Sequence, residues 1–260
     1  MTRESFVKGP QGKLHVSVAG DHKETLPVLM LHADLGTLAQ WDEVRAGLSD
    51  RYPTVAFDRR GHGQSDSPRD GSFRHEDAAR DVLAVTDALG IQRFILVGHS
   101  GGALTAWSCA VAAPTRVAGL LLVDPAIDAR TLPAGMVEGV LTAMRGPDYR
   151  KVTEDYYRSI AGSNQIVADR VVAEALATPQ ATIVGGFEAL RDFDPHRFAG
   201  AYRGAMLSII QPKMDIDGAL HRIDPAIAHI AIPDTGHWIQ LDAPGPFLDR
   251  ANEFLSTLSI

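Results

Sequence analysis

The chain has 260 residues, of which 45% are hydrophobic and 22% charged, and its formal net charge is −7. This balance is typical of one globular domain, and the acidic charge argues against a surface for nucleic acid or anionic membranes. No stretch resembles a signal peptide or a transmembrane span, and a single cysteine, Cys109, excludes an internal disulfide and a thiolate metal site. We therefore expect a cytoplasmic protein that is a monomer or a homodimer.

Short apolar runs and helical patterns alternate through the first half of the chain. Alternation of apolar and polar residues predicts an antiparallel strand at 13–19, and continuous apolar runs predict strands buried on both faces at 26–31, 54–57, 94–97 and 117–123. Helices are predicted at 37–49, with Thr37 as the N-cap, at 75–89 and at 103–112. This order predicts a doubly wound, mostly parallel α/β sheet.

The pattern changes after residue 125. Helical periodicity dominates at 136–144, 149–160, 166–177 and 181–190, so we interpret 126–202 as a helical cap inserted between two strands. A strand at 205–210, a short helix at 218–222, a strand at 227–232 and a final helix at 245–258 complete the sheet. Residues 1–125 and 203–260 are thus predicted to form the core.

A serine lies between glycines where a predicted strand meets a predicted helix, at residues 98–102 (Gly-His-Ser-Gly-Gly). So tight a turn needs glycines on both sides, and it directs the hydroxyl of Ser100 toward the N-terminus of the following helix. There the helix dipole favours negative charge. We predict that Ser100 is a nucleophile, with a plain glycine-rich turn as the alternative.

A serine nucleophile needs a positioned base, and His237 is the best candidate. It follows the last predicted strand, so it lies at the same edge of the sheet as Ser100. The alternative is a loop histidine that caps the next helix. His22, His75 and His196 have polar neighbours in the sequence and are expected at the surface.

The carboxylate that would orient the base has two candidates. Asp124 ends the strand beside the serine, although Asp-Pro is also a common turn opener. Asp215 follows the strand 205–210, the commoner location for this acid, but it is close to His237 in sequence. We predict Asp124 and keep Asp215 as the alternative, with Asp217 behind both.

The backbone N–H groups of Gly101 and Asp34 are predicted to stabilise the oxyanion. A carboxylate at position 34 is unusual, because its charge would oppose an oxyanion. We expect it to turn away and cap the following helix, with a contact to substrate or to the attacking water as the alternative. His32, in the same loop, is expected to contact substrate, whereas Asp58 and His62 are expected to be structural.

Together the segments 31–36, 57–66, 98–102 and 235–238 resemble the α/β-hydrolase superfamily, most of all its cap-bearing esterase and lactonase branch, which includes enol-lactonases. The resemblance implies an α/β-hydrolase fold and a Ser-His-Asp triad that needs neither cofactor nor metal. The family usually has His-Gly where this chain has His32-Ala33. It also usually has a Gly-x-x-Asp after the penultimate strand, which is missing here; some members without it carry their acid at the strand end that Asp124 matches.

The predicted function is therefore hydrolysis of a small-molecule carboxylic ester or lactone through an acyl-enzyme. Substrate choice is expected to lie with the cap. The candidate pocket residues are Met136, Tyr156, Phe187, Phe193 and Trp238, with packing in the core as the alternative for each. Alternatives with the same triad are C–C bond hydrolysis, cofactor-free peroxidation and acyl transfer. Two alternatives are not enzymes in the usual sense. One is a receptor or signalling protein with slow turnover, and the other is a scaffold without a pocket.

Overall fold

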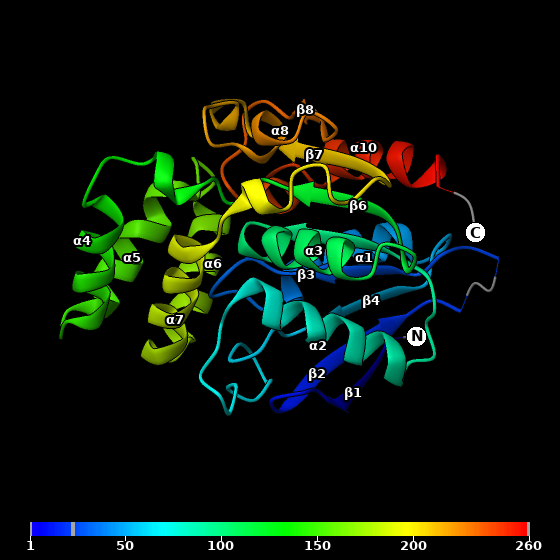
Figure 1. Ribbon diagram of the computed structural model, residues 1–260, viewed down its shortest axis with the longest axis horizontal. Helices are drawn as coiled ribbons and strands as arrows, with labels where there is room; N and C mark the ends of the chain where they lie inside the picture. Colours follow the sequence, from blue (N-terminus) through cyan, green and yellow to red (C-terminus); the bar gives the residue numbers. More distant parts are fainter. Residues whose placement is uncertain (1, 22–23, 259–260) are drawn as a thin grey trace.

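The computed structural model describes residues 2–21 and 24–258, and within them eight strands form one sheet (Figure 1). Their order is β1-β2-β4-β3-β5-β6-β7-β8, in which β1–β2 and β2–β4 are antiparallel and the other neighbours are parallel. The strands are β1 (Arg3–Lys8), β2 (Lys13–Ala19), β3 (Val28–Leu31), β4 (Thr54–Phe57), β5 (Phe94–His99), β6 (Val117–Val123), β7 (Ala205–Ile210) and β8 (Ala228–Ala231). The predicted doubly wound, mostly parallel sheet is confirmed.

Side chains of the central strands alternate between two apolar layers. In β3, Leu29 and Leu31 belong to the layer with α2 (His75–Ala88) and α3 (Gly101–Ala112). Val28 and Met30 belong to the layer with α1 (Asp42–Leu48) and α10 (Pro244–Ser256). Each fully buried leucine or valine contributes about 1.5–3 kcal/mol relative to an exposed one. Strands covered on both faces form a rigid platform for the loops at their carboxyl ends.

Four helices lie between β6 and β7, and Figure 1 shows them gathered at one end of the sheet. They are α4 (Met136–Arg145), α5 (Tyr149–Ile160), α6 (Gln165–Ala177) and α7 (Gln180–Asp192). Their apolar faces form a cluster of their own, which also takes in Leu35 and Trp238. Leu35 follows β3 and Trp238 follows β8, so these helices pack on the edge of the sheet where the parallel strands end.

The remaining elements are short: α8 (Leu220–Ile223), α9 (Ile239–Asp242) and the 3-10 turns η1 (Leu38–Trp41), η2 (Ala129–Thr131), η3 (Pro195–Arg197) and η4 (Pro212–Met214). None of the helices in the described ranges is long and apolar enough to cross a membrane.

Apart from shifts of a few residues in the bounds of several elements, two details of the fold differ from the expectations. Strand β1 was not predicted, because all its side chains except Val7 are exposed and no apolar run marks it. Thr37 precedes a 3-10 turn, and its side chain makes no cap bond within the described residues. The Asp58 carboxylate, which comes from the loop after β4, accepts the hydrogen bond of the Leu38 N–H at 2.8 Å instead.

Candidate active site

Ser100 lies between β5 and α3 in a backbone conformation that side chains rarely adopt, with φ 55° and ψ −122°. The neighbouring glycines are required sterically. A Cβ on Gly98 would clash with the carbonyl oxygen of Gly102, and a Cβ on Gly102 would clash with that of His32. The turn therefore has the tight geometry that the sequence predicted, and it places the Ser100 hydroxyl beside the first turn of α3.

Residues with strained backbone conformations cluster at this edge of the sheet. Among the described residues, four that are not glycine have a positive φ: Leu35, Ser100, Asp124 and Asp234. Each lies in the segment that follows a parallel strand, namely β3, β5, β6 or β8. Such conformations cost about 1–3 kcal/mol each and persist where the surroundings enforce them, often at functional sites.

Asp124 lies directly after β6 and contacts the imidazole of His237. The Nδ1 of His237 donates to Oδ2 of Asp124 at 2.7 Å. Gln211, the first residue after β7, donates twice to the same carboxylate, from its backbone N–H at 3.0 Å and from its amide Nε2 at 2.6 Å. Asp124 is fully buried. Three hydrogen-bond donors fix the orientation of its carboxylate.

The backbone of His237 is also held on both sides. Its N–H donates to the carbonyl of Ile160 in α5 at 3.0 Å. Its carbonyl accepts from Nε2 of His99 at 2.8 Å. Since Nε2 of His99 is a donor, Nδ1 is the acceptor of the Gln240 amide at 3.1 Å. Burial and the neighbouring His237 hold the pKa of His99 well below its usual value. The ring of His99 is therefore neutral and holds the backbone of His237 in place.

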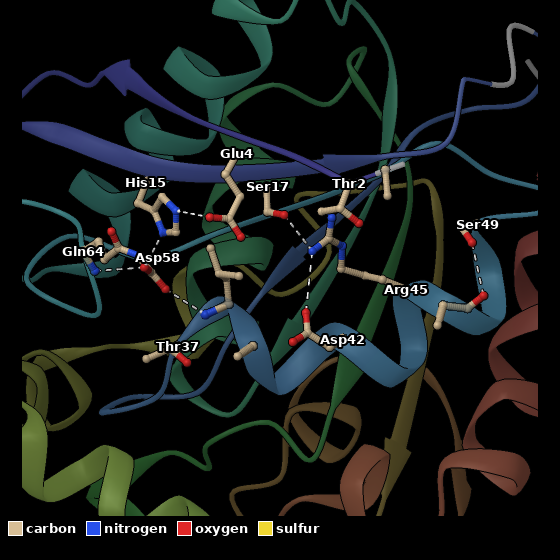
Figure 2. Close-up of a pocket in the computed structure, with 14 residues that line it drawn as sticks. Thr2, Glu4, His15, Ser17, Thr37, Asp42, Arg45, Ser49, Asp58 and Gln64 are labelled. Carbon is tan, nitrogen blue, oxygen red and sulfur yellow. Dashed lines mark hydrogen bonds and ion pairs between the residues drawn. The ribbon is translucent and has the colours of Figure 1, made fainter.

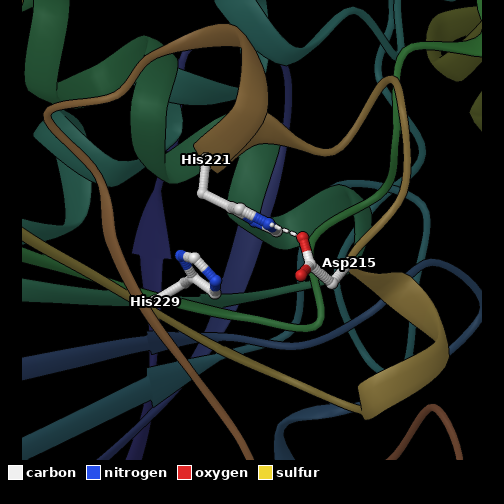
Figure 3. A group of neighbouring side chains, drawn as sticks. All are labelled: Asp215, His221 and His229. Carbon is white, nitrogen blue, oxygen red and sulfur yellow. Dashed lines mark hydrogen bonds and ion pairs between the residues drawn. The ribbon is translucent and has the colours of Figure 1, made fainter.

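Asp215 is bound elsewhere, as Figure 3 shows. Its Oδ1 accepts from Nε2 of His221 at 2.9 Å and from Nε of Arg222 at 2.7 Å. These two bonds lower the pKa of the Asp215 carboxyl despite the opposing effect of desolvation. The structure thus brings Asp124, and not Asp215, to His237, within the residues that it describes.

The same cluster does not suit a metal ion, although Asp215, His221 and His229 have potential ligand atoms within 4.8 Å of one another. The imidazoles of His221 and His229 stack with centroids 4.0 Å apart and an angle of 22° between their planes. Nearly parallel rings direct their lone pairs side by side rather than toward a common point, and Arg222 already neutralises the carboxylate.

Asp34 does not cap a helix, which corrects the first expectation for its side chain. Its Oδ1 accepts from Nη1 of Arg59 at 2.9 Å, and both side chains are buried. Its carbonyl accepts from the hydroxyl of Tyr157 in α5 at 2.6 Å. Burial would raise the pKa of the Asp34 carboxyl, but the charge of Arg59 and its hydrogen bond to Oδ1 outweigh it and hold the pKa below its usual value.

His32 is a structural residue, which corrects the expectation of a substrate contact. Its ring is fully buried, its Nδ1 donates to the carbonyl of Ala33 at 2.7 Å, and its Nε2 accepts from the Arg59 backbone N–H at 2.9 Å. Burial, His62 and Arg59 keep the pKa of His32 well below its usual value. The neutral ring therefore joins the loops after β3 and β4.

Three other histidines are expected at the surface from their sequence neighbours. His75 is buried rather than at the surface, where Nδ1 lies 3.1 Å from Oγ1 of Thr105 and burial lowers its pKa to about 3. Its polar sequence neighbours gave no sign of the core beneath it. His196 is exposed as expected, with 62% of its side chain accessible. His22 lies outside the described residues.

A cavity of about 470 Å³ lies between the helices that follow β6 and the edge of the sheet, and Ser100 and His237 both line it. The expected residues Met136, Tyr156 and Phe187 line its mostly apolar wall. Trp238 lines a much smaller adjoining space of about 20 Å³, which also borders Asp34 and Ser100. Phe193 is elsewhere: it stacks on Phe198 with ring centroids 4.9 Å apart.

A larger hollow of about 680 Å³ lies over β1, β2 and α1 and includes neither Ser100 nor His237 in its lining (Figure 2). Asp58 borders it and accepts from the Leu38 and Gln64 N–H groups and pairs with Nδ1 of His15 at 2.9 Å. Asp58 thus has the structural role expected of it. His62 is likewise buried, with Nδ1 donating to the carbonyl of Arg60 at 2.9 Å.

Sequence reasoning missed three residues around the site: Gln211, Arg59 and Tyr157. Gln211 could have been found, because it directly follows a parallel strand and therefore lies at the same edge as Asp124. Arg59 also follows a strand end, but its pairing with Asp34 depends on how two loops fold. Tyr157 had no sequence signal, since an aromatic residue on a helix usually packs in a core.

Known proteins share this fold. The profile of the α/β hydrolase fold family matches residues 27–244. An sn-1-specific diacylglycerol lipase of Mus musculus is 25% identical over 91% of this chain and 83% of its own length. Several other curated relatives match shorter segments, so that the chain spans between 31% and 39% of their length.

Solved structures match over nearly the whole chain. A hydrolase from Pseudomonas aeruginosa has a TM-score of 0.85 at 21% identity and covers 97% of this chain and 98% of its own. An enol-lactonase from Burkholderia xenovorans LB400 has a TM-score of 0.85 at 19% identity and covers 97% of this chain and 100% of its own. At these identities the likeness shows the fold.

Proposed function

The chain belongs to the α/β hydrolase fold family, and we propose that it hydrolyses a small-molecule carboxylic ester or lactone through an acyl-enzyme on Ser100. The observation that carries the proposal is the 2.7 Å contact between His237 Nδ1 and Asp124, at the same cavity wall as a serine in a strained strand-to-helix turn. The names of the lipase and the enol-lactonase among the similar proteins are consistent with it.

In the proposed reaction each residue has one task. Nδ1 of His237 donates to Asp124, which leaves Nε2 free to accept the Ser100 proton as Oγ attacks the carbonyl carbon. The negative charge that develops on the carbonyl oxygen is stabilised by the backbone N–H groups of Gly101 and Asp34. His237 then gives its proton to the leaving alkoxide. In the second half a water, deprotonated by His237, releases the acid from Ser100.

Substrate choice is proposed to lie with the helices inserted at 126–202, acting as a cap. Their side chains supply most of the lining of the 470 Å³ cavity, including Met136, Tyr156 and Phe187. A cavity of this size and polarity suits the apolar part of a small molecule. The core residues Ser100, Gln211 and His237 supply polar groups at the same wall.

Replacement of Ser100 by alanine tests the proposal. Ser100→Ala should lower kcat for p-nitrophenyl acetate by roughly 10⁴-fold or more, because the variant has no hydroxyl to attack the carbonyl carbon. The oxyanion donors and the binding pocket remain and account for the residual activity. A fluorophosphonate probe should label the wild type and not the variant. The matched control is Ser108→Ala, which removes a buried hydroxyl bonded to the carbonyl of Leu104 in the same helix. Hydrolysis by Ser100→Ala at the wild-type rate contradicts the proposal.

A further inference from the structure

Tyr156 of α5 carries a hydroxyl group without a hydrogen-bond partner. Its ring packs edge to face on that of Phe187, with centroids 5.3 Å apart. Within residues 2–21 and 24–258 no group forms a hydrogen bond with its hydroxyl. The hydroxyl of the next residue, Tyr157, is bound instead, because it donates to the carbonyl of Asp34 at 2.6 Å. Of these two neighbouring tyrosines, it is Tyr156 that lines the cavity of about 470 Å³.

The Tyr156 hydroxyl is enclosed by protein and still open to the cavity. Burial, and after it the charge of Asp34, raise the pKa of this hydroxyl, so it keeps its proton at neutral pH and remains a donor. It is nevertheless not among the buried polar atoms that lack both a partner and accessible surface. The side chain as a whole is half-buried. A molecule bound in the cavity can therefore reach the hydroxyl.

Tyr156 lies where two spaces meet, the cavity of about 470 Å³ and the small space of about 20 Å³. Three polar side chains line both of them, namely Ser100, His237 and Tyr156. The other residues common to the two linings are apolar: Ile160, Phe187 and Leu190. The junction thus has one hydroxyl beyond the proposed nucleophile and base.

Two hydrogen bonds fix the position of Tyr156 relative to the site. Tyr157 donates to the carbonyl of Asp34, and the carbonyl of Ile160 accepts from the backbone N–H of His237 at 3.0 Å. Both contacts lie within little more than one helical turn of Tyr156. A donor held in this way needs no reorganisation when negative charge develops beside it.

Two oxygens of an ester gain negative charge in the proposed reaction. The backbone N–H groups of Gly101 and Asp34 are assigned to the carbonyl oxygen. The leaving oxygen gains charge as its bond to the carbonyl carbon breaks, and it must then lie near Nε2 of His237 to take the proton. Because His237 and Tyr156 line the same two spaces, an oxygen near this nitrogen lies in the part of the site that Tyr156 borders.

We propose that Tyr156 is a further catalytic residue, whose hydroxyl donates a hydrogen bond to the leaving oxygen. The electron pair of the breaking C–O bond goes to this oxygen, which takes the proton from His237, while Tyr156 keeps its own proton. The stabilisation grows with the charge localised on the oxygen, and so with the basicity of the leaving alkoxide. The substrate class is then an ester of an aliphatic alcohol, or a lactone, rather than an activated phenyl ester. This inference rests on the proposed function and adds the leaving group.

Two esters with the same acyl group test the inference. The leaving group of 4-nitrobenzyl butyrate is a basic alkoxide, whereas that of 4-nitrophenyl butyrate is a weakly basic phenoxide. Tyr156→Phe should lower kcat/KM by about 10- to 100-fold for the benzyl ester and by about threefold or less for the phenyl ester. The quantity compared is the ratio of the two losses. A ratio within about twofold of one overturns the inference, because a hydroxyl that acts elsewhere affects both esters alike.

Further variants identify the hydroxyl as the cause. The matched control is Tyr157→Phe, which removes the neighbouring hydroxyl that contacts Asp34 and should change kcat/KM of both esters by the same factor. Tyr156→Leu removes the hydroxyl together with the ring and should give the same ratio of losses as Tyr156→Phe. In a series of substituted phenyl butyrates, kcat/KM should fall more steeply with the basicity of the leaving phenoxide in Tyr156→Phe than in the wild type.

The outcomes separate the inference from the proposed function. If Ser100→Ala abolishes hydrolysis while Tyr156→Phe lowers kcat/KM of both esters equally, the inference is overturned and the proposed function stands. If Ser100→Ala still hydrolyses both esters at the wild-type rate, both are overturned. A selective loss for the benzyl ester in Tyr156→Phe that Tyr157→Phe does not reproduce supports the assignment to Tyr156.

Discussion

Among the individual residues of the site, Asp124 has the most complete set of contacts. Three donors from two residues hold its two oxygens, and its side chain has no exposed surface. Such a carboxylate fixes both the tautomer and the orientation of the imidazole that it contacts. Asp215 has an equally well-defined setting, but its partners His221 and Arg222 belong to the segment around α8.

The two carboxylates should therefore respond differently to the same change. Asp124→Asn is expected to lower kcat by about 10⁴-fold at neutral pH, because an amide at this position favours the wrong tautomer of His237. Asp215→Asn should leave kcat within about threefold of the wild type. Steady-state hydrolysis of p-nitrophenyl acetate measures both. A large loss in Asp215→Asn together with a small one in Asp124→Asn would assign the acid to Asp215.

Local sequence patterns predicted some of these residues and not others, for physical reasons. The turn around Ser100 is determined by its own glycines, so five residues suffice to predict it. The acid stayed open between Asp124 and Asp215, because both follow strands and only the folded loops show which carboxylate meets His237. Asp34 was misjudged for a related reason: Arg59, which pairs with it, is 25 positions away in the sequence.

Among the secondary-structure elements, α5 connects the inserted helices to the site in two places. Tyr157 donates from its hydroxyl to the carbonyl of Asp34, and the carbonyl of Ile160 accepts from the backbone N–H of His237. One helix therefore contacts both the loop that carries a proposed oxyanion donor and the loop that carries the proposed base.

Loss of the Tyr157 hydroxyl should weaken this connection. Tyr157→Phe leaves the buried carbonyl of Asp34 without that donor and should lower the free energy of unfolding by about 1–1.5 kcal/mol. Denaturant unfolding measures the change. Tyr149→Phe, at the start of the same helix and half-buried, is the matched control and should change it by less than about 0.5 kcal/mol. Equal effects of the two substitutions would contradict a special role for the Tyr157 contact.

Most helices and strands could be predicted because the spacing of apolar residues in the sequence agrees with the face that each element buries. The central strands are apolar on both faces, and the helices of the insertion have an apolar stripe, so each pattern carried its own signal. Strand β1 has neither, since its place at the antiparallel edge depends on pairing with β2 along its whole length. Pairing partners of that kind cannot be inferred from a segment whose side chains remain in solvent.

At the scale of the whole molecule, the fold encloses several histidines that stay neutral. Burial lowers the pKa of His75 to about 3 and that of His62 to about 4, and it lowers those of His32 and His99 well below the usual value. In the unfolded chain these side chains take up protons near pH 6.5. Below that pH the unfolded state binds protons that the folded state does not.

The stability of the protein should consequently fall as the medium becomes acidic. The contribution of the neutral histidines to the free energy of unfolding is fully present above pH 6.5. It should decrease by about 1.4 kcal/mol per pH unit for each of these histidines as the pH falls toward 4. Urea unfolding at pH 7.5 and at pH 5.5 measures the difference in the free energy of unfolding. Equal values at the two pH values would contradict the prediction, as would a His75→Gln variant with an undiminished slope.

The position of Asp124 also affects how this fold can be re-engineered. Ser100 and Asp124 directly follow the two strands of one strand–helix–strand unit, β5–α3–β6, and the inserted helices begin only after it. An acid carried after β7 would instead lie beyond the insertion, and its position would depend on how that insertion folds. In this chain the segment between β6 and β7 could be exchanged for one of another size without a change in the chain that carries Ser100 and Asp124. The exchanged segment would still have to replace the contacts that Tyr157 and Ile160 of α5 make with Asp34 and His237.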